Sequence, residues 1–267
     1  MQLSFGLVVS PSSADTLARF DELAAWLRAE KTLELSSRPV ATYKELAESV
    51  REGSSDIAWL PPVAYAWLAE AVTPLGSIVR QGQTHYAAAL VVREDSPIRA
   101  LEDLNGVRAG WVDPWSAAGY VVPRLELARA KIDPSVAFSA ETFHGSHREA
   151  LLALGRSDCD VVGTYARRPS ETTQAVTGGW SEIEGLAVRV LATFGEIPTD
   201  VVAVRRNLGP REHEHAQDAF REACRDAKAR PLVRALFGGD DLNENLEPGH
   251  DTLRRAYESG IARGLFD

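Results

Sequence analysis

The segment Val112-Asp113-Pro114-Trp115-Ser116-Ala117-Ala118-Gly119-Tyr120 carries more structural information than any other part of this 267-residue chain. It follows an apolar run typical of a strand, 107–112, and precedes a run with helical character, 120–130. Ser116 is placed to cap the helix, and the three small residues after it allow a ligand to approach the backbone closely. Backbone N–H groups at a helix start are unpaired and lie at the positive end of the helix dipole. The segment therefore predicts an anion site, although an ordinary strand-to-helix turn that binds nothing fits the spacing equally well.

Short apolar strands alternate with amphipathic helices along most of the chain. In residues 43–50 the apolar positions follow the helical period, and Gly53 ends that helix; residues 56–60 form a buried strand. Ser146-His147-Arg148-Glu149 is a capping box at the start of a later helix, and Pro123 predicts a kink or restart in the helix after the Ser116 turn. This alternation indicates an α/β fold with parallel sheets, helices on their faces and ligands at the carboxyl ends of strands.

Composition narrows the class of partner. A hydrophobic fraction of 45% and a charged fraction of 25% are ordinary for a globular domain, and the net charge of −9 disfavours nucleic acid and anionic membranes. No run approaches the roughly 18 apolar residues of a membrane span, so no membrane insertion is expected. Cys159 and Cys224 lie far apart on unlike segments, which indicates neither a disulfide framework nor a metal site, and no cofactor motif is visible. A small anionic ligand stays compatible with this charge.

Several segments resemble, in order, the phosphonate/phosphate/phosphite-binding components of ABC importers. The resemblance covers residues 3–225, and the matching segments are 43–46, Asp56-Ile57-Ala58-Trp59-Leu60-Pro61-Pro62-Val63-Ala64-Tyr65, 86–92, 95–98, 101–106, 113–119, 143–147 and Ile197-Pro198-Thr199-Asp200. The resemblance implies a two-lobed type II periplasmic-binding-protein fold with a ligand cleft between the lobes. Residues 1–93 would form one lobe, 94–198 the other, and 199–267 would return to the first lobe with the C-terminal helices.

The resemblance also identifies the Ser116 turn as the anion site, with one departure. In the family a Ser-Thr-Ser-Gly turn donates hydroxyls and backbone N–H groups to the phosphonate oxygens; here Ser116, Ala117, Ala118 and Gly119 occupy those positions. A hydrogen bond to a charged group contributes roughly 1.5–3 kcal/mol, so two missing hydroxyls weaken phosphonate binding by about two to four powers of ten. We therefore expect no tight phosphonate binding, and a carboxylate or a larger, more apolar anion stays plausible.

Other candidate ligand contacts are aromatic or titratable. Trp115 offers a ring on which a ligand can stack, Asp200 is placed to receive a ligand ammonium group, and the remaining candidates are Tyr43, Trp59, Tyr65, Tyr86 and His147. Each also has a structural interpretation: core packing for the tyrosines and Trp59, a solvated first-turn residue for His147, and a hydrogen-bond acceptor at the hinge for Asp200. His144 is expected at the surface.

These observations favour capture of a small anionic or zwitterionic metabolite, phosphonate-like or carboxylate, with an ABC permease as a partner. The alternative is a cytoplasmic lyase, dehydratase or biosynthetic enzyme on the same fold, with His147 or Asp200 as general acid or base. A ligand-sensing module is a third possibility. The chain runs from Met1 almost directly into a strand. We expect a cytoplasmic protein if Met1 is the natural start and an extracytoplasmic one if an export signal was removed.

Overall fold

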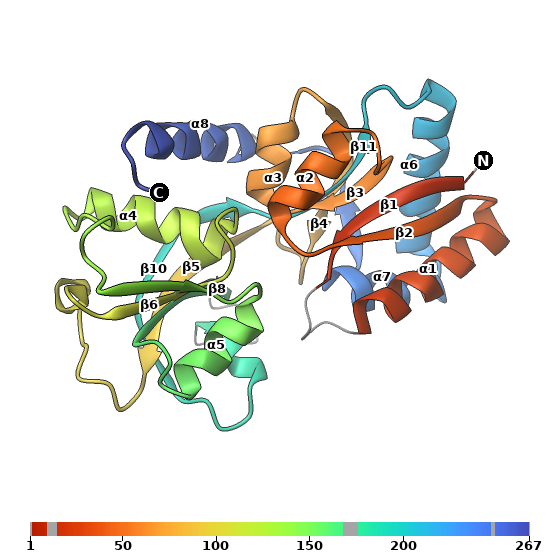
Figure 1. The fold of residues 1–267 in the computed structure, drawn as a ribbon. Coiled ribbons are helices and arrows are strands. Elements are labelled where there is room, and N and C mark those ends of the chain that lie inside the picture. Colours follow the sequence, from red (N-terminus) through yellow and green to blue (C-terminus); the bar gives the residue numbers. More distant parts are fainter. Residues whose placement is uncertain (1, 10–14, 168–175, 247–248, 267) are drawn as a thin grey trace. The chain divides into compact units, whose positions relative to one another are not determined.

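The computed structural model describes residues 2–9, 15–167, 176–246 and 249–266 (Figure 1). It divides into two compact units, each with its own sheet. Unit 1 comprises residues 1–84 and 198–250, and unit 2 comprises residues 85–197 and 251–267.

Unit 1 is built on a six-stranded sheet with the strand order β12-β4-β11-β3-β1-β2. Strand β1 pairs in parallel with β2 and β3, whereas β11 is antiparallel to β3 and β4. Its strands and helices are β1 (Gln2–Val8), α1 (Asp15–Lys31), β2 (Glu34–Val40), α2 (Tyr43–Arg51), β3 (Ile57–Leu60), α3 (Pro62–Leu68), β4 (Val72–Val79), β11 (Val201–Arg205), α6 (Pro210–Arg225), α7 (Ala229–Phe237) and β12 (Asp241–Asn243).

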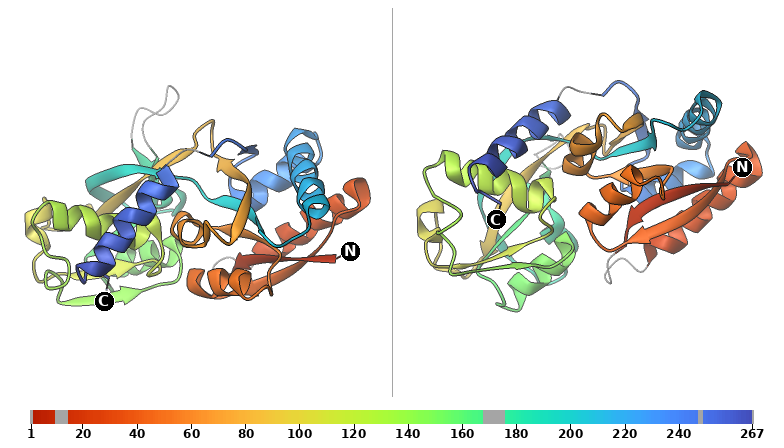
Figure 2. Two further views of the ribbon diagram at one scale, coloured as in Figure 1. Left: turned by 90° about the horizontal axis from the view of Figure 1, so that it is seen from above. Right: turned by 45° about the horizontal axis from the view of Figure 1, so that its top comes forward.

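Helices cover the sheet of unit 1 because each has one apolar stripe. Helices α1, α6 and α7 lie beside the sheet of unit 1 (Figure 2). Phe20 of α1, Phe220 of α6 and Phe237 of α7 gather around Phe5 of β1 in one core cluster. Helix α2 starts where predicted: Thr42 caps it by accepting from the Glu45 N–H at 3.1 Å. The apolar positions of α2 are buried, as its sequence period requires.

Unit 2 is built on a second sheet with the order β10-β5-β8-β6-β7, and β9 pairs with β8. Strand β6 is parallel to β7 and β8, and β5 is antiparallel to β8. Its elements are β5 (His85–Arg93), η2 (Leu101–Leu104), β6 (Arg108–Trp111), the π-helical turn η3 (Ala117–Val121), α4 (Val122–Arg129), β7 (Ala140–Phe143), α5 (His147–Gly155), β8 (Val161–Arg167), β9 (Thr177–Gly178), η4 (Gly179–Glu182) and β10 (Val188–Pro198), with α8 (Gly249–Ala262) entering it at residue 251. The sheets are therefore mixed, not purely parallel as the alternation of elements predicted.

The C-terminal segment differs from the expected domain division, which returned all of residues 199–267 to the first lobe. Residues 251–267 belong to unit 2 instead. Arg124 of α4, which is fully buried, donates through Nε to the carbonyl of Leu265, and the Phe266 ring lies 5.8 Å from that of Tyr120. The sequence pattern contains no sign of this anchor because its partners lie far apart along the chain.

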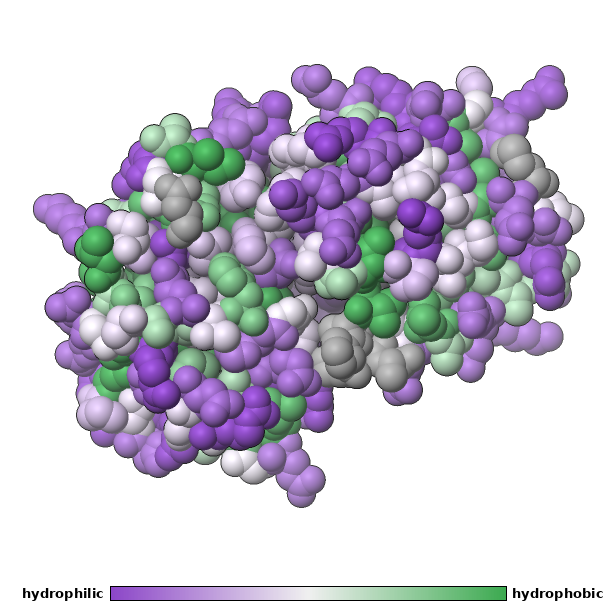
Figure 3. Space-filling model, in the orientation of Figure 1, coloured by the Kyte–Doolittle hydropathy of each residue, from purple (hydrophilic) through white to green (hydrophobic). Residues whose placement is uncertain are grey.

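On the face drawn in Figure 3, hydrophilic and hydrophobic residues are interspersed. Among these residues the exposed large hydrophobic side chains are Trp67, Val136, Phe143 and Ile261. Helices in the described ranges all fall short of the length and apolar character that a bilayer span requires.

Candidate functional site

The Ser116 turn begins a helix, as the sequence predicts. The Ser116 hydroxyl accepts from the Gly119 N–H at 3.1 Å, and the Ser116 N–H donates to the carbonyl of Asp113 at 2.9 Å. The turn continues through η3 into α4, whose first turn contains Pro123. The predicted restart at Pro123 is thus present, because a proline fits the first turn of a helix but not its interior.

Gly119 is required by close packing, not by an unusual backbone conformation. A Cβ at this position would lie 2.3 Å from Cγ2 of Val112 and 2.7 Å from Oγ of Ser116. The Gly119 carbonyl accepts from the Val112 N–H at 3.2 Å, which ties the helix start back to the end of β6. The glycine therefore fixes the shape of the turn.

The turn is buried, and its donors are backbone groups. Ser116, Ala117 and Ala118 expose 3%, 2% and 1% of their surface, and the turn packs against β5 and β8. The first N–H groups of a helix have no acceptor within the helix. The Ser116 hydroxyl takes the N–H of Gly119, so the N–H groups of Ala117 and Ala118 are the candidate anion donors. Both side chains are single methyl groups, so they add little bulk around these N–H groups.

Helix α5 starts beside this turn. Ser146 caps α5 by accepting from the Glu149 N–H at 3.1 Å, as the capping box predicts. The Gly145 N–H donates to the carbonyl of Val112 at 2.8 Å, which joins the loop after β7 to the loop after β6. Two helix N-termini therefore share one edge of the sheet of unit 2, at the carboxyl ends of its parallel strands, and their dipoles favour an anion there.

His147 is held at this edge by β8. Its Nδ1 lies 3.0 Å from the hydroxyl of the buried Thr164, and its ring meets that of Tyr165 edge-on at a centroid distance of 5.0 Å. Thr164 was not predicted as a site residue. The available signal in the sequence is a single hydroxyl side chain that follows the apolar residues of the buried strand β8.

Two further aromatic candidates lie in unit 2. Trp115 is half-buried, and its ring lies 6.4 Å from that of Tyr257 on α8. Burial raises the pKa of the Tyr257 hydroxyl, and the nearby carboxylate of Asp113 raises it further. Tyr86 is half-buried on β5. Tyr257 was missed from the sequence because the C-terminal segment lies outside the range of the family resemblance.

His144 corrects an expectation. Its Nε2 atom is buried, and a Cβ built on Gly110 would lie 3.2 Å from it. Burial lowers the pKa of His144, with a smaller contribution from Arg156. His144 is therefore a partly buried residue at the end of β7, because its N–H donates to the Trp111 carbonyl at 2.9 Å and draws the loop inward.

The candidates in unit 1 fall into two environments. Tyr65 exposes 8% of its surface, packs edge-on against His250 at 4.9 Å, and burial raises the pKa of its hydroxyl. Tyr43 is half-buried at the first position of α2. The structure thus places Tyr65 among packed side chains and Tyr43 at a helix start.

Trp59 and Asp200 meet at one carboxylate oxygen. Trp59 Nε1 lies 3.2 Å from Oδ2 of Asp200, and Nη2 of Arg80 lies 2.5 Å from the same atom. The sequence analysis did not identify Arg80 as a neighbour of Asp200. The available signal was the turn at Gln81-Gly82, which marks Arg80 as the residue at the end of a strand. Asp200 therefore already has a cationic partner inside unit 1.

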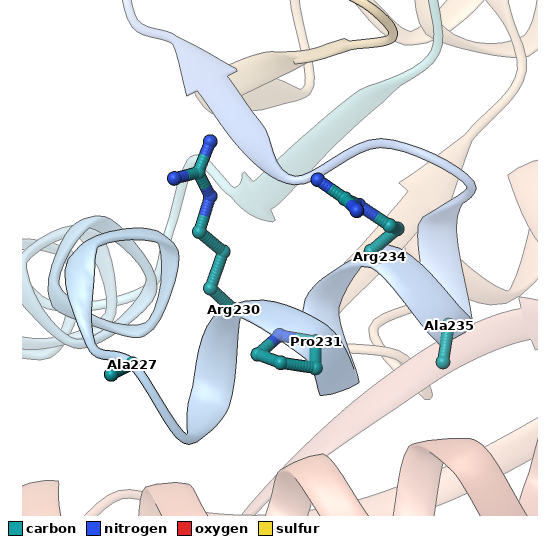
Figure 4. Close-up of a pocket in the computed structure, with 5 residues that line it drawn as sticks. All are labelled: Ala227, Arg230, Pro231, Arg234 and Ala235. Atoms are coloured by element: carbon teal, nitrogen blue, oxygen red, sulfur yellow. The ribbon is translucent and has the colours of Figure 1, made fainter.

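A surface hollow elsewhere in unit 1 lies apart from these residues. It has a volume of about 340 Å³ and is lined by Ala227, Arg230, Pro231, Arg234 and Ala235 (Figure 4). Both arginines pair with Asp240. Among the described residues, no three His, Cys, Asp or Glu side chains gather in a way that suits a metal ion.

Comparison with known proteins connects this geometry to one family. Residues 5–244 match the family model described as "ABC transporter, phosphonate, periplasmic substrate-binding protein". The chain is 26% identical over 172 residues to the phosphate-import protein PhnD of Mycolicibacterium smegmatis, a match that covers 60% of this chain and 53% of that protein. It is 22% identical over 241 residues to the phosphonates-binding periplasmic protein of Escherichia coli, covering 88% of this chain and 70% of that protein.

A solved structure shows the same fold. PhnD1 of Prochlorococcus marinus in complex with methylphosphonate superposes with a TM-score of 0.77 at 13% identity, covering 99% of this chain and 98% of that one. The chain spans about half the length of the mycobacterial relative.

Proposed function

The chain belongs to the family of substrate-binding proteins of ABC phosphonate transporters, and from this premise we propose that it captures a small anionic metabolite for import. The observation that carries the proposal is the edge of unit 2 where two capped helices begin side by side. The two helix dipoles and the N–H groups of Ala117 and Ala118 favour a negative charge at this edge.

The ligand class follows from the alanines. The turn offers backbone donors but only one hydroxyl, and that hydroxyl is engaged as a cap. A phosphonate-like or carboxylate group attached to a bulkier, more apolar body fits this chemistry better than a small phosphonate does, because Ala117 and Ala118 carry methyl groups in place of the hydroxyls that would bind a small phosphonate. The contacts that we propose for the ligand are Tyr43, Trp59, Tyr65, Tyr86, Trp115, Ser116, Ala117, Ala118, Gly119, His147 and Asp200.

An ABC permease is the proposed partner. The relatives named above are import components, and a binding protein delivers its ligand unchanged. Mass spectrometry of ligand released from the purified protein therefore separates capture from catalysis. We expect the same compound before and after incubation; a converted product that disappears with His147→Asn or Asp200→Asn would overturn the proposal in favour of an enzyme.

A charge introduced into the turn tests where the anion binds. In Ala118→Asp the new carboxylate accepts from the same N–H groups and repels a ligand anion. Calorimetric titration with phosphate, methylphosphonate, methanesulfonate and short carboxylates is expected to show binding of at least one by the unaltered protein, and a loss of at least about tenfold in the variant. Ala140→Asp, at an exposed position of β7 in the same unit, is the matched control. Equal affinities in both variants would place the anion elsewhere.

A further inference from the structure

This inference rests on the proposed function and concerns what holds the anion site of unit 2 in shape. We propose that Tyr257 and Phe266, near the end of the chain, are positioning residues of the Ser116 turn. These two residues, the C-terminal pair, hold the turn on both sides of the N–H groups of Ala117 and Ala118. Every residue on which the proposal rests belongs to unit 2.

The C-terminal pair contacts aromatic side chains at both ends of the turn. The Tyr257 ring lies 6.4 Å from that of Trp115, which precedes the cap of the turn. The Phe266 ring lies 5.8 Å from that of Tyr120, which belongs to η3. The rings of the pair lie 5.1 Å apart, so four rings form a continuous chain from one end of the turn to the other. Ring contacts at these distances are stabilising, and the chain therefore restricts the movement of both ends.

The chain returns toward the turn because α8 ends in a Schellman motif. The Leu265 N–H donates to the carbonyl of Gly260 at 3.0 Å, and the Gly264 N–H donates to the carbonyl of Ile261 at 2.9 Å. Gly264 has a φ angle of 66°, the left-handed conformation that this motif requires. A Cβ on Gly260 would lie 2.3 Å from Cε2 of Phe266, so a glycine is needed there for the ring to pack against α8.

Arg124 of α4 fixes the backbone beside Phe266. The guanidinium of this fully buried residue donates through Nε to the carbonyl of Leu265 and forms an ion pair with Glu141. Its Cζ atom lies 5.0 Å from the centroid of the Tyr120 ring, a cation–π contact. The same arginine thus contacts the residue before Phe266 and the ring against which Phe266 packs.

The proposed donors make the turn depend on this support. A side-chain donor can rotate toward a ligand, whereas the direction of a backbone N–H group is set by the conformation of the chain. A turn that has lost the C-terminal pair must be ordered by the ligand itself, and the lost conformational entropy reduces the affinity. We therefore expect weaker anion binding in a variant that keeps the fold.

The test compares Phe266→Ala with Phe138→Ala. Both phenylalanines are half-buried in unit 2, but Phe138 packs on Trp111 of β6, at a centroid distance of 5.5 Å. Both variants are expected to lose similar stability in urea. The probe is the most tightly bound of phosphate, methylphosphonate, methanesulfonate and the short carboxylates. Phe266→Ala alone is expected to lower its affinity, by at least about fivefold in calorimetric titration, and Phe266→Tyr, which keeps the ring, is expected to preserve it.

Hydrogen exchange without a ligand measures the positioning of the turn directly. The N–H groups of Gly119 and Val121 donate to the hydroxyl and the carbonyl of Ser116, at 3.1 and 2.9 Å. In Phe266→Ala both are expected to exchange at least about tenfold faster, whereas the Glu149 N–H, which donates to the cap of α5, is expected to keep its rate. An equal increase at Glu149 would show that the ring only stabilises unit 2 as a whole, and would overturn the inference.

The outcomes separate this inference from the proposed function. If the unaltered protein binds an anion, unchanged affinity or unchanged exchange in a folded Phe266→Ala variant overturns the inference alone. Should that variant fail to fold, Gly264→Ala decides, with Gly185→Ala as its control: both place an alanine at a left-handed position of unit 2, with φ angles of 66° and 76°. Only Gly264→Ala is expected to weaken binding and speed exchange in the turn, and equal behaviour of the two overturns the inference. Binding of no anion in the panel overturns the proposed function, and with it the role of the C-terminal pair in binding.

Discussion

Unit 2 offers a ligand mainly backbone groups, whereas unit 1 offers side chains that are already paired with one another. In unit 2 the donors that we propose are the N–H groups of Ala117 and Ala118, in a turn held by the cap of Ser116 and the close packing of Gly119. In unit 1 the charge of Asp200 is balanced by Arg80 before any ligand arrives. The comparison shows that the candidate residues of unit 2 depend on backbone geometry, whereas those of unit 1 depend on pairing between side chains.

The largest expected effect comes from breaking the backbone site at Gly119. In Gly119→Ala the new Cβ would lie 2.3 Å from Cγ2 of the buried Val112, so the side chain or the turn must shift. Overpacking of this kind costs up to about 3 kcal/mol in the free energy of unfolding, and anion binding is expected to be lost with the turn. Urea denaturation and calorimetry measure the two effects.

Gly155→Ala is the matched control for that change. A Cβ at Gly155 meets Leu186 Cδ1 at 3.4 Å, an ordinary contact, and an alanine in a helix is favoured over glycine by up to about 1 kcal/mol. The control should therefore be as stable as the unaltered protein or more so. If Gly119→Ala behaved like Gly155→Ala, the turn would not depend on close packing.

The second prediction restores the hydroxyls that the turn lacks. Ala117→Thr with Ala118→Ser is expected to raise the affinity for phosphate or a small phosphonate by at least about tenfold, or about 1.4 kcal/mol, through hydrogen bonds to a charged group. A bulkier natural ligand should bind less tightly, because the added atoms fill the space beside the alanines.

Ala117→Val, with Ala118 kept, is the control that adds the volume of threonine without its hydroxyl. It is expected to give no gain, which separates hydrogen bonding from steric effects at positions that are 2% and 1% exposed. A folded double variant with no gain for any phosphorus oxyanion would mean that the ligand binds elsewhere.

The contrast between the units also explains what could be predicted from the sequence. The Ser116 cap, the start of α2 at Tyr43 and the Ser146 cap of α5 depend on neighbours within a few residues, and all three are present. The antiparallel pairing of β5 with β8 depends on partners 71 to 79 positions apart, and local periodicity does not encode it.

The same limit applies to individual side chains. The ion pair of Arg80 with Asp200 and the anchor from Arg124 to Leu265 each join residues more than 100 positions apart. The family resemblance identified Asp200 as a candidate site residue, but it did not identify Arg80, whose positive charge balances that of the Asp200 carboxylate. Charge partners across a fold have no sequence period, so the structure was needed to find them.

A third prediction tests whether the site in unit 2 also depends on side-chain positioning. Thr164→Val removes the hydroxyl 3.0 Å from Nδ1 of His147 while keeping the shape of the side chain. The loss of one hydrogen bond, about 1 kcal/mol, is expected to lower anion affinity about fivefold. Thr142→Val, at an exposed position of β7, is the control and should leave affinity unchanged. Equal affinities would show that the backbone donors act without His147.

The smallest expected effect distinguishes the two units by pH. Burial lowers the pKa of His144 in unit 2, so protonation of this imidazole favours the unfolded state. The stability that the neutral ring provides is present above its unfolded pKa of about 6.5 and is lost as the pH falls below that value. In unit 1, burial raises the pKa of Asp56, but hydrogen bonds from Ser4 and Arg205 outweigh that effect and lower it overall. The stability that the ionised Asp56 carboxylate provides is therefore present above its unfolded pKa of about 4 and is lost only as the pH falls below that value.

Hydrogen exchange between about pH 7 and about pH 5 should show faster opening of unit 2 alone, and His144→Gln should remove the change while His85→Gln should not. Equal pH dependence of both units in this window would show that His144 does not set the stability of unit 2.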